Sequence, residues 1–184
     1  SITYGTLPTP TRTGYTFNGW QLVPNDYQQI EYLQSNATQY IDSGVAGNNS
    51  SLGFETAYSW VTLPASGKYA AVFGSFTGED YVATRILQKY NNTTYFNINS
   101  KASGGSGSYT GTRTTGTTYT DALYPTSTGM VYYTNDSTAT RDRVAGTSYT
   151  GNILIFALKE NSSKSAIKLY YLKIYDGGTL IRNF

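Results

Sequence analysis

Tyrosine, asparagine and arginine side chains concentrate on two neighbouring segments in the middle of the chain, residues 81–90 and 93–100. Sugars stack their C–H faces on aromatic rings, and amide and guanidinium groups hydrogen-bond their hydroxyls, so this composition suits a carbohydrate ligand. If the two segments are paired strands, their side chains lie within reach of one another. The candidate ligand-binding residues are Tyr81, Arg85, Tyr90, Tyr95, Asn97 and Asn99.

The second of these segments leaves a structural alternative open. Its period-two alternation places Tyr95, Asn97 and Asn99 on one face of a strand, with Phe96 and Ile98 on the other. Three polar or amphipathic residues in a row do not indicate a core face. They indicate either a binding surface or the ordinary solvent-exposed face of an edge sheet, and the sequence does not separate the two.

The sequence lacks the residues on which most hydrolytic chemistry depends. With no histidine and no cysteine, it has neither the commonest general base nor a thiol nucleophile. Retaining glycosidases need two carboxyl groups about 5–5.5 Å apart. The adjacent acids Glu79 and Asp80 occupy a turn, and on a strand they would point to opposite faces. We therefore expect no catalytic residue and predict that the protein is not an enzyme.

No cofactor and no metal site are predicted either. Zinc sites depend mainly on histidine and cysteine ligands, which the chain lacks. Calcium accepts carboxylate and carbonyl oxygens, so a structural calcium ion at the turns is the alternative that we keep. Its candidate ligands are Asp42, Asp80, Asp136 and Asp176. None of them belongs to an Asp-x-Asp cluster, and solvated turn residues explain them better.

Charge and hydropathy exclude two classes of partner. The net charge is +2 and no more than two basic residues are adjacent, which is too little for a nucleic-acid interface. No apolar run approaches the roughly 18 residues that a membrane-spanning helix needs. The opening residues SITYGTLPTP contain no apolar stretch of the kind found in signal peptides, so any such segment is expected outside this chain.

Composition and alternation favour an all-β fold. Tyrosine and glycine number 19 each, whereas charged residues make up 13% of the chain. Tyrosine favours pleated, half-buried surfaces and glycine favours turns. Residues 52–60 alternate with Leu52, Phe54, Tyr58 and Trp60 on one face, which predicts a half-buried antiparallel strand with a buried Trp60.

Further strands follow the same logic. Residues 153–158 are apolar on both faces, which predicts a central strand between two layers. Residues 166–184 predict a hairpin that turns at Asp176, Gly177 and Gly178, because an Asp-Gly pair supplies the positive φ angles of a tight turn. Other strands are predicted at residues 68–76, 81–90, 93–100 and 129–136.

Two segments depart from this pattern. Residues 101–118, KASGGSGSYTGTRTTGTT, predict a flexible surface loop or a loosely held edge hairpin that contributes nothing to the core. The first 23 residues contain Pro8 and Pro10, which force an extended backbone. With a boundary near Pro24, we expect two parts, residues 1–23 and residues 24–184.

Residues 4–20 resemble the middle of an InlB B-type (Listeria–Bacteroides) repeat, a small β-rich module of bacterial surface proteins. The Gly-Tyr-x-Phe-x-Gly-Trp pattern of that repeat is present as Gly14, Tyr15, Phe17, Gly19 and Trp20. The opening strand and the closing segment of the repeat are missing. Residues 1–23 are therefore expected to be a partial repeat or an extended N-terminal segment.

The remainder resembles the concanavalin A-like, laminin-G-like domains of gut bacterial surface proteins and some of their phages. The matching stretches are YQQIEYLQSNATQYIDSGV (27–45), AVFGS (71–75), NILIFAL (152–158) and LKIYDGGTLIRNF (172–184). The resemblance implies a two-sheet antiparallel β-sandwich, a concanavalin A-like jelly roll, for residues 24–184. It also implies that Tyr32, Tyr40 and Ile41 pack between the sheets.

Together these features predict a non-catalytic carbohydrate-binding or adhesion module. The resemblance implies that the module is covalently part of a larger multidomain, secreted or cell-surface bacterial protein. It also implies an extracellular or cell-surface location, with a glycan or a host surface protein as partner. A structural spacer domain and a protein-binding adhesin domain, bacterial or phage, are the alternatives.

Overall fold

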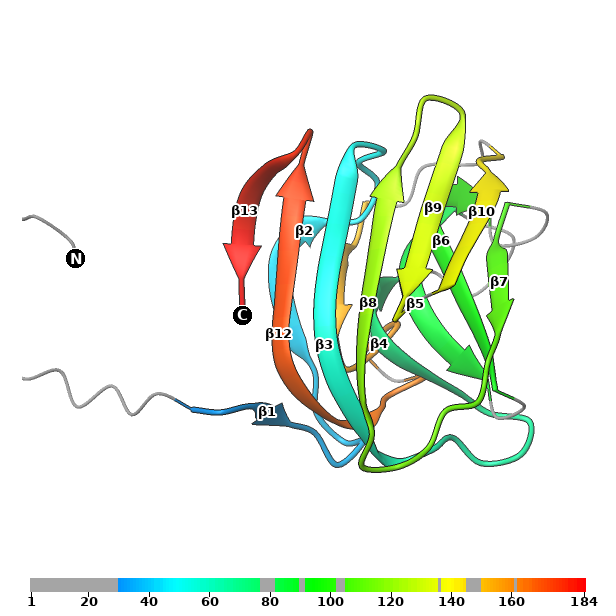
Figure 1. The fold of residues 1–184 in the computed structure, drawn as a ribbon. Helices are drawn as coiled ribbons and strands as arrows, with labels where there is room; N and C mark the ends of the chain where they lie inside the picture. Colours follow the sequence, from blue (N-terminus) through cyan, green and yellow to red (C-terminus); the bar gives the residue numbers. More distant parts are fainter. Residues whose placement is uncertain are drawn as a thin grey trace, which may run out of the picture. The chain divides into compact units, whose positions relative to one another are not determined.

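Alternating aromatic and β-branched side chains fold this chain into strands, as the sequence predicts. The computed structural model describes residues 30–76, 82–89, 92–101, 105–135, 137–144, 150–160 and 162–184. Within these ranges it contains thirteen strands and no helix (Figure 1). The strands form two antiparallel sheets packed face to face, so the predicted β-sandwich is confirmed.

The compact unit comprises residues 31–184. The predicted repeat fragment, residues 1–23, lies outside the described residues, as does the predicted boundary at residue 24, and both stay predictions. In the ranges that the structure describes, no helix is long and apolar enough to cross a membrane.

The first sheet has seven strands. Its hydrogen-bonded order is β1-β12-β3-β8-β9-β10, and β13 also pairs with β12. The longest strands, β3 and β12, lie side by side in it (Figure 1). Its strands are β1 (Leu33–Gln34), β3 (Leu52–Thr62), β8 (Thr118–Pro125), β9 (Gly129–Thr134), β10 (Ser137–Asp142), β12 (Ala166–Asp176) and β13 (Thr179–Asn183).

The second sheet has six strands in the order β2-β11-β4-β5-β6-β7. Strand β7 lies beside β10 of the first sheet, where the two layers approach each other at one edge (Figure 1). The strands of this sheet are β2 (Ile41–Ala46), β4 (Tyr69–Ser75), β5 (Val82–Lys89), β6 (Thr93–Lys101), β7 (Gly107–Thr110) and β11 (Asn152–Ile155).

Aromatic rings fill the space between the two sheets. Phe54 of β3 stacks on Phe73 of β4 with ring centroids 4.5 Å apart. Phe96 of β6 stacks on Tyr132 of β9 at 4.9 Å. All four side chains are fully buried. Large rings remove much apolar area from water when they are buried, so these cross-sheet stacks help to hold the two layers together.

Strand β3 is more buried than its alternation predicts. Trp60 is 1% exposed, as predicted, but Ala57 and Ser59 on the opposite face are only 5% and 3% exposed. Ser59 Oγ lies 3.3 Å from the hydroxyl of Tyr170 on the neighbouring β12. The prediction of a half-buried strand is wrong because tyrosines of the adjoining strands cover its outer face.

The tyrosines near the start of the unit do not lie where the family resemblance implies. Tyr40 is 38% exposed, with Lys164 Nζ 5.5 Å from its ring centroid. Tyr32 meets Tyr170 edge to face, at a centroid distance of 6.0 Å. Ile41 alone of the three packs against the inter-sheet core. The buried tyrosines are instead Tyr58, Tyr119 and Tyr132.

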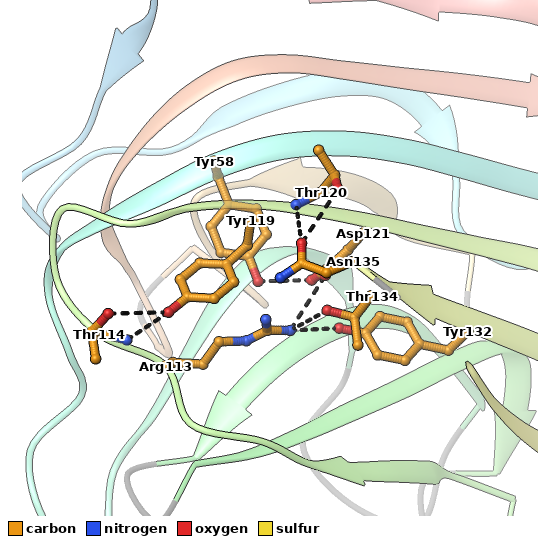
Figure 2. A network of polar contacts seen from close by, with 9 residues as sticks. All are labelled: Tyr58, Arg113, Thr114, Tyr119, Thr120, Asp121, Tyr132, Thr134 and Asn135. Carbon is orange, nitrogen blue, oxygen red and sulfur yellow. Dashed lines mark hydrogen bonds and ion pairs between the residues drawn. The ribbon is translucent and has the colours of Figure 1, made fainter. Parts of the chain in front are cut away.

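A buried ion pair lies inside the sandwich, where the sequence predicts only a loose loop. Arg113, between β7 and β8, is 4% exposed and its Nη2 lies 3.3 Å from Asp121 Oδ1 (Figure 2). The same Nη2 donates to the Tyr132 hydroxyl at 2.9 Å and to Thr134 Oγ1 at 2.8 Å. Tyr58 OH donates to Asp121 Oδ2 at 2.7 Å. The prediction that residues 101–118 add nothing to the core is therefore wrong.

The surroundings of this pair keep the cation charged. Burial alone lowers the pKa of Arg113, but Tyr58 and Asp121 outweigh it, so the pKa is raised. Burial, together with the charge of Asp121, raises the pKa of Tyr58 and of Tyr132 well above the usual value. At neutral pH the Arg113 guanidinium is therefore charged, and the hydroxyls of Tyr58 and Tyr132 are neutral.

The C-terminal hairpin has the predicted turn. Asp176 pairs with Thr179 across a two-residue loop, in which Gly177 and Gly178 have φ angles of 54° and 85°. A side chain in the left-handed region costs about 1–2 kcal/mol. We predict that Gly178→Val lowers the free energy of unfolding, measured by urea denaturation, by about that amount.

The matched control for this turn is Gly177→Asn, which should be nearly neutral because asparagine tolerates the left-handed region. Equal stability of Gly178→Val and the parent protein would contradict the turn conformation.

Candidate functional site

A pocket of about 340 Å³ lies on the outer face of the six-stranded sheet. Its position follows from strand alternation. Arg85 of β5 pairs with Asn97 of β6, and their neighbours Ile86, Phe96 and Ile98 belong to the inter-sheet core. Side chains that alternate with core residues point away from the core. The pocket is lined by Tyr69, Phe76, Arg85, Tyr95, Ser106, Leu158 and Ser163.

Aromatic rings form the walls of this pocket. Tyr69 of β4 and Tyr95 of β6 meet edge to face, with centroids 6.1 Å apart. Phe76, directly after β4, has its ring centroid 4.9 Å from Cζ of Arg85. Tyr69 is 41% exposed, so part of its side chain is accessible to solvent at the mouth of the pocket. Flat apolar walls of this kind are what a sugar ring or another flat apolar face stacks against.

Leu158 closes one side of the pocket because the chain reverses after β11. Residues 153–158 do not form the single central strand that the sequence predicts. The strand ends at Ile155, and Phe156 adopts a φ of 69°. The segment that follows runs along β4, where the Ala71 amide donates to the Ser163 carbonyl at 2.8 Å. Leu158 then packs on Ala71, outside the main core.

Gly74 leaves room for Leu158 to pack close to β4. A Cβ at this position would lie 2.5 Å from Leu158 Cδ1 and 2.8 Å from Arg85 Cβ. Both distances are shorter than non-bonded carbons tolerate, so the absence of a side chain lets Leu158 and Arg85 meet beneath the pocket.

Arg85 lies at the bottom of the pocket, held by a polar cluster. Its Nε donates to Asn97 Oδ1 at 3.0 Å, and its Nη2 donates to Ser106 Oγ at 3.3 Å. Asn97 Nδ2 donates to the same Ser106 Oγ at 2.9 Å and to Ser100 Oγ at 3.3 Å. The guanidinium is therefore fixed along one edge, and Asn97 acts as the residue that positions it.

The charge of Arg85 is not neutralised within the described part of the chain. Arg85 is 7% exposed, yet the ion pairs in that part are Arg113–Asp121 and Lys173–Glu55. Burial lowers the pKa of Arg85 to about 10, against the opposing influence of Tyr69 and Tyr95. The group remains charged at neutral pH, so the pocket contains a desolvated cation without a described carboxylate partner.

The structure brings three of the predicted ligand-binding residues together. Arg85 and Tyr95 line the pocket and Asn97 supports Arg85 from behind. Asn97 is fully buried, so the predicted exposed row of Tyr95, Asn97 and Asn99 is wrong. Strand β6 is also not at an edge, because it lies between β5 and β7.

The other three predicted residues are not part of this cluster. Asn99 has a φ of 39° and donates its amide to Thr84 Oγ1 at 2.7 Å, so its main chain leaves the regular alternation. Tyr81 and Tyr90 lie outside the described residues, and their predicted role stays a prediction.

Several lining residues were missed at the sequence level. Ser106 lies in the glycine-rich segment, and Leu158 and Ser163 lie in the segment after β11. No local pattern marks them, since a backbone reversal brings them to the sheet. Tyr69 and Phe76 flank an apolar strand, and an aromatic residue at each end of that strand was the available signal.

Two further hollows adjoin the pocket. One shares Tyr69 and Ser163 with it and contains Lys68 and Lys164. The other shares Leu158 and contains Asp42, Lys159 and Glu160. The pocket is therefore the middle of a longer depression, with basic residues at one end and two carboxylates at the other.

A separate hollow of about 510 Å³ lies on the outer face of the seven-stranded sheet. Glu55 accepts hydrogen bonds there from the hydroxyls of Tyr124 and Tyr175. Its pKa is lowered, chiefly by the Tyr124 hydrogen bond and against the effect of burial, with Tyr175 and Lys173 adding to the shift. Its bonds to several donors make it a structural acceptor rather than a proton donor.

The candidate calcium ligands do not gather. Asp42 accepts from the Gly44 amide at 2.8 Å and from Asn152 Nδ2 at 3.1 Å, and Asp176 accepts from Ser51 Oγ. Asp80 and Asp136 lie outside the described residues. Among the residues that are described, no three acidic side chains come close enough to hold a metal ion.

Comparison with known sequences gives no relative. No protein-family model matches the chain, and no curated protein does so either.

Solved structures, in contrast, share the fold. Domains LG4-5 of the mouse laminin alpha1 chain align with a TM-score of 0.51 and 9% identity over 83% of this chain and 42% of that one. A mutant NanB sialidase of Streptococcus pneumoniae aligns with a TM-score of 0.54 and 14% identity, over 83% of this chain and 26% of that one. The CBM40 of a Ruminococcus gnavus IT-sialidase, bound to alpha2,3 sialyllactose, aligns with a TM-score of 0.52 and 9% identity, over 82% and 94%.

The chain spans less than half of the laminin structure and about a quarter of the NanB structure. At these identities the likeness concerns architecture alone. It establishes that the described unit has the β-sandwich fold of laminin LG domains and of a sialidase CBM40.

Proposed function

We propose that this protein is a non-catalytic carbohydrate-binding module. The observation that carries the proposal is the pocket over β4, β5 and β6, in which Tyr69, Phe76 and Tyr95 surround the guanidinium of Arg85. A few fixed polar groups inside aromatic walls are the usual composition of a sugar site. The shared fold with a CBM40 solved with sialyllactose supports the same assignment.

The absence of a suitable acid–base pair at this pocket supports binding without catalysis. No carboxylate lines the pocket among the described residues. The adjoining hollow contains Asp42 and Glu160, and both oxygens of Asp42 accept hydrogen bonds, from the Gly44 amide and from Asn152 Nδ2. Release of reducing sugar from a bound glycan would contradict the non-catalytic assignment.

The setting that we propose is the exterior of a bacterial cell. The laminin and sialidase structures that share the fold are longer chains, which supports a module within a multidomain protein. Adhesion to a protein and a pure spacer role are the alternatives. Capture of host matrix protein without any glycan binding would favour the first, and the absence of both would favour the second.

We predict that Tyr69→Ala weakens glycan binding about 5- to 30-fold, because an aromatic contact in a binding site contributes about 1–2 kcal/mol. The change in unfolding free energy should stay within about 1 kcal/mol, since the ring is partly exposed. A glycan array would identify the ligand, and isothermal titration calorimetry would measure its affinity for both proteins.

Tyr133→Ala is the matched control. Tyr133 is 43% exposed, against 41% for Tyr69, and its ring meets Tyr124 edge to face at 6.2 Å on the other sheet. It therefore loses an equivalent aromatic contact away from the pocket, and its glycan affinity should be unchanged. Equal losses in the two variants would place the binding site elsewhere.

A further inference from the structure

Two arginines are buried among the described residues, and their hydrogen-bond partners differ in charge. Arg113 is paired with Asp121 and hydrogen-bonded to Tyr132 and Thr134 (Figure 2). Arg85 is bonded only to neutral oxygens among the described residues. A buried ion without an opposite charge lowers stability. Among the described residues, no carboxylate supplies the opposite charge for Arg85.

The effect of Arg85 on folding has a definite sign. Burial lowers its pKa from the usual arginine value to about 10 on folding, so the folded state binds this proton less well than the unfolded state. The ionised group therefore destabilises the fold at every pH below about 10. The loss of stability becomes smaller only as the pH rises from there towards the higher pKa of the unfolded state. A residue that lowers stability in this way is a candidate for function.

The free edge of Arg85 suits an oxyanion. A guanidinium has five N–H donors, of which one on Nε and one on Nη2 are used by Asn97 and Ser106. Nη1 has no hydrogen-bond partner in the described part of the chain. Three donors are thus left without a partner among the described residues, in a side chain that lines the pocket. Such a fork binds carboxylate or sulfate oxygens in a two-pronged manner.

The adjoining hollows set a direction for a longer ligand. Past Tyr69 and Ser163 lie Lys68 and Lys164, and no carboxylate lines that hollow among the described residues. Past Leu158 the hollow is lined by Asp42 and Glu160 together with Lys159, so its carboxylates outnumber its cation. An anionic chain is attracted to the first end and repelled from the second.

We propose that the site binds an anionic oligosaccharide, with a carboxylate or sulfate group on the free edge of Arg85 and the next sugar extending over Tyr69 towards Lys68. The inference rests on the proposed carbohydrate-binding function and names the ligand class for the same pocket. The direction follows from Lys68 and Lys164 at one end of the depression. The charge requirement follows from a buried guanidinium that has no carboxylate partner among the described residues.

The test is calorimetry with paired probes: sialyllactose and lactose, oligogalacturonate and its methyl ester, and a sulfated oligosaccharide with its desulfated form. We expect at least one charged probe to bind about 10- to 100-fold more tightly than its neutral partner, the range for a hydrogen bond to a charged group. Which pair shows the preference distinguishes a carboxylate from a sulfate. Arg85→Gln should abolish that preference.

The outcomes distinguish failure of the anionic-ligand inference from failure of the carbohydrate-binding proposal. Equal binding of charged and neutral partners, or a preference that survives in Arg85→Gln, overturns the inference and leaves carbohydrate binding standing. No binding of any probe, neutral or charged, overturns both. Thermal unfolding provides the folding control, since Arg85→Gln should melt at or above the parent temperature. If it fails to fold, Arg85→Lys keeps the charge without the fork, and it should still lose most of the preference.

The direction is tested by Lys68→Gln, which should weaken an oligosaccharide of two or more charged units about two- to fivefold and leave a monosaccharide unaffected. Lys159→Gln, at the opposite end, is the matched control and should change neither affinity. Loss of affinity in the Lys159 variant alone would show that the ligand runs the other way.

Discussion

Asp121→Ala is expected to lower the free energy of unfolding by about 3–5 kcal/mol, as for other buried ion pairs that lose one partner. Asp121 is 2% exposed and its carboxylate is the counter-charge of Arg113. Removing it leaves the guanidinium desolvated between the sheets. It also deprives the Tyr58 hydroxyl of its acceptor. Urea denaturation followed by tryptophan fluorescence measures the change, because Trp60 packs edge to face on Tyr58 at 6.0 Å.

The control for this prediction removes both charges. In Arg113→Met/Asp121→Leu neither charge of the pair remains, so the double variant should be more stable than Asp121→Ala. Its free energy of unfolding should come close to that of the parent protein. The hydroxyls of Tyr58 and Tyr132 still lose partners, which sets a residual loss of about 1–3 kcal/mol. A loss below about 1 kcal/mol for Asp121→Ala would show that the pair is not buried in solution.

Alternation predicts the strands well because it reports a local property. Residues 166–184 give their hairpin and its two-glycine turn directly, since both depend on side chains and φ angles within a few residues. Trp60 is likewise identified as buried from its own strand. Alternation within one strand does not show whether side chains of other strands bury its outer face. Tyr170 buries Ser59 in this way.

Part of the candidate site was predicted from the sequence, because that part depends on neighbouring strands. Arg85 and Tyr95 are correctly grouped because they lie on paired strands that follow each other in sequence. The burial of Asn97 depends on Ser106, which a glycine-rich segment brings back across the sheet. Leu158 reaches the pocket only because Phe156 adopts a positive φ angle. Such a conformation is rare for a bulky residue, and no sequence signal indicates it.

Composition did not predict the burial of Arg113. It lies in a segment of glycine, serine and threonine that lacks apolar residues able to build a core. Its partner Asp121 lies on β8, and its other acceptors, Tyr132 and Thr134, lie on β9. The ion pair forms because the segment crosses from one sheet to the other over the end of the sandwich. Only the three-dimensional arrangement supplies that information.

Phe96→Ala is expected to lower the free energy of unfolding by about 3–5 kcal/mol, the usual loss for a buried aromatic ring. Phe96 is fully buried and stacks on Tyr132 across the sandwich. Its removal opens a cavity between the sheets at the edge closed by β7. Tyr95→Ala, one residue away on the opposite face, is the control and should lose clearly less, because its ring is only partly buried.

Substitution of Gly107 tests directly whether Phe96 packs against β7. A Cβ at residue 107 would lie 2.0 Å from Cζ of Phe96, so the glycine of β7 makes room for the ring. Gly107→Ala alone should therefore lower the free energy of unfolding by about 1–3 kcal/mol through overpacking. In the Phe96→Ala background the ring is gone, and the same substitution should have almost no effect.

The four proteins form a double-mutant cycle with an expected coupling of about 1–3 kcal/mol. Urea denaturation gives all four free energies under one condition. Strict additivity would mean that Gly107 and Phe96 are not in contact in solution. Coupling of the expected sign would show that this part of the glycine-rich segment is packed against the core, because only a side chain directly beneath Gly107 can make its methyl group costly.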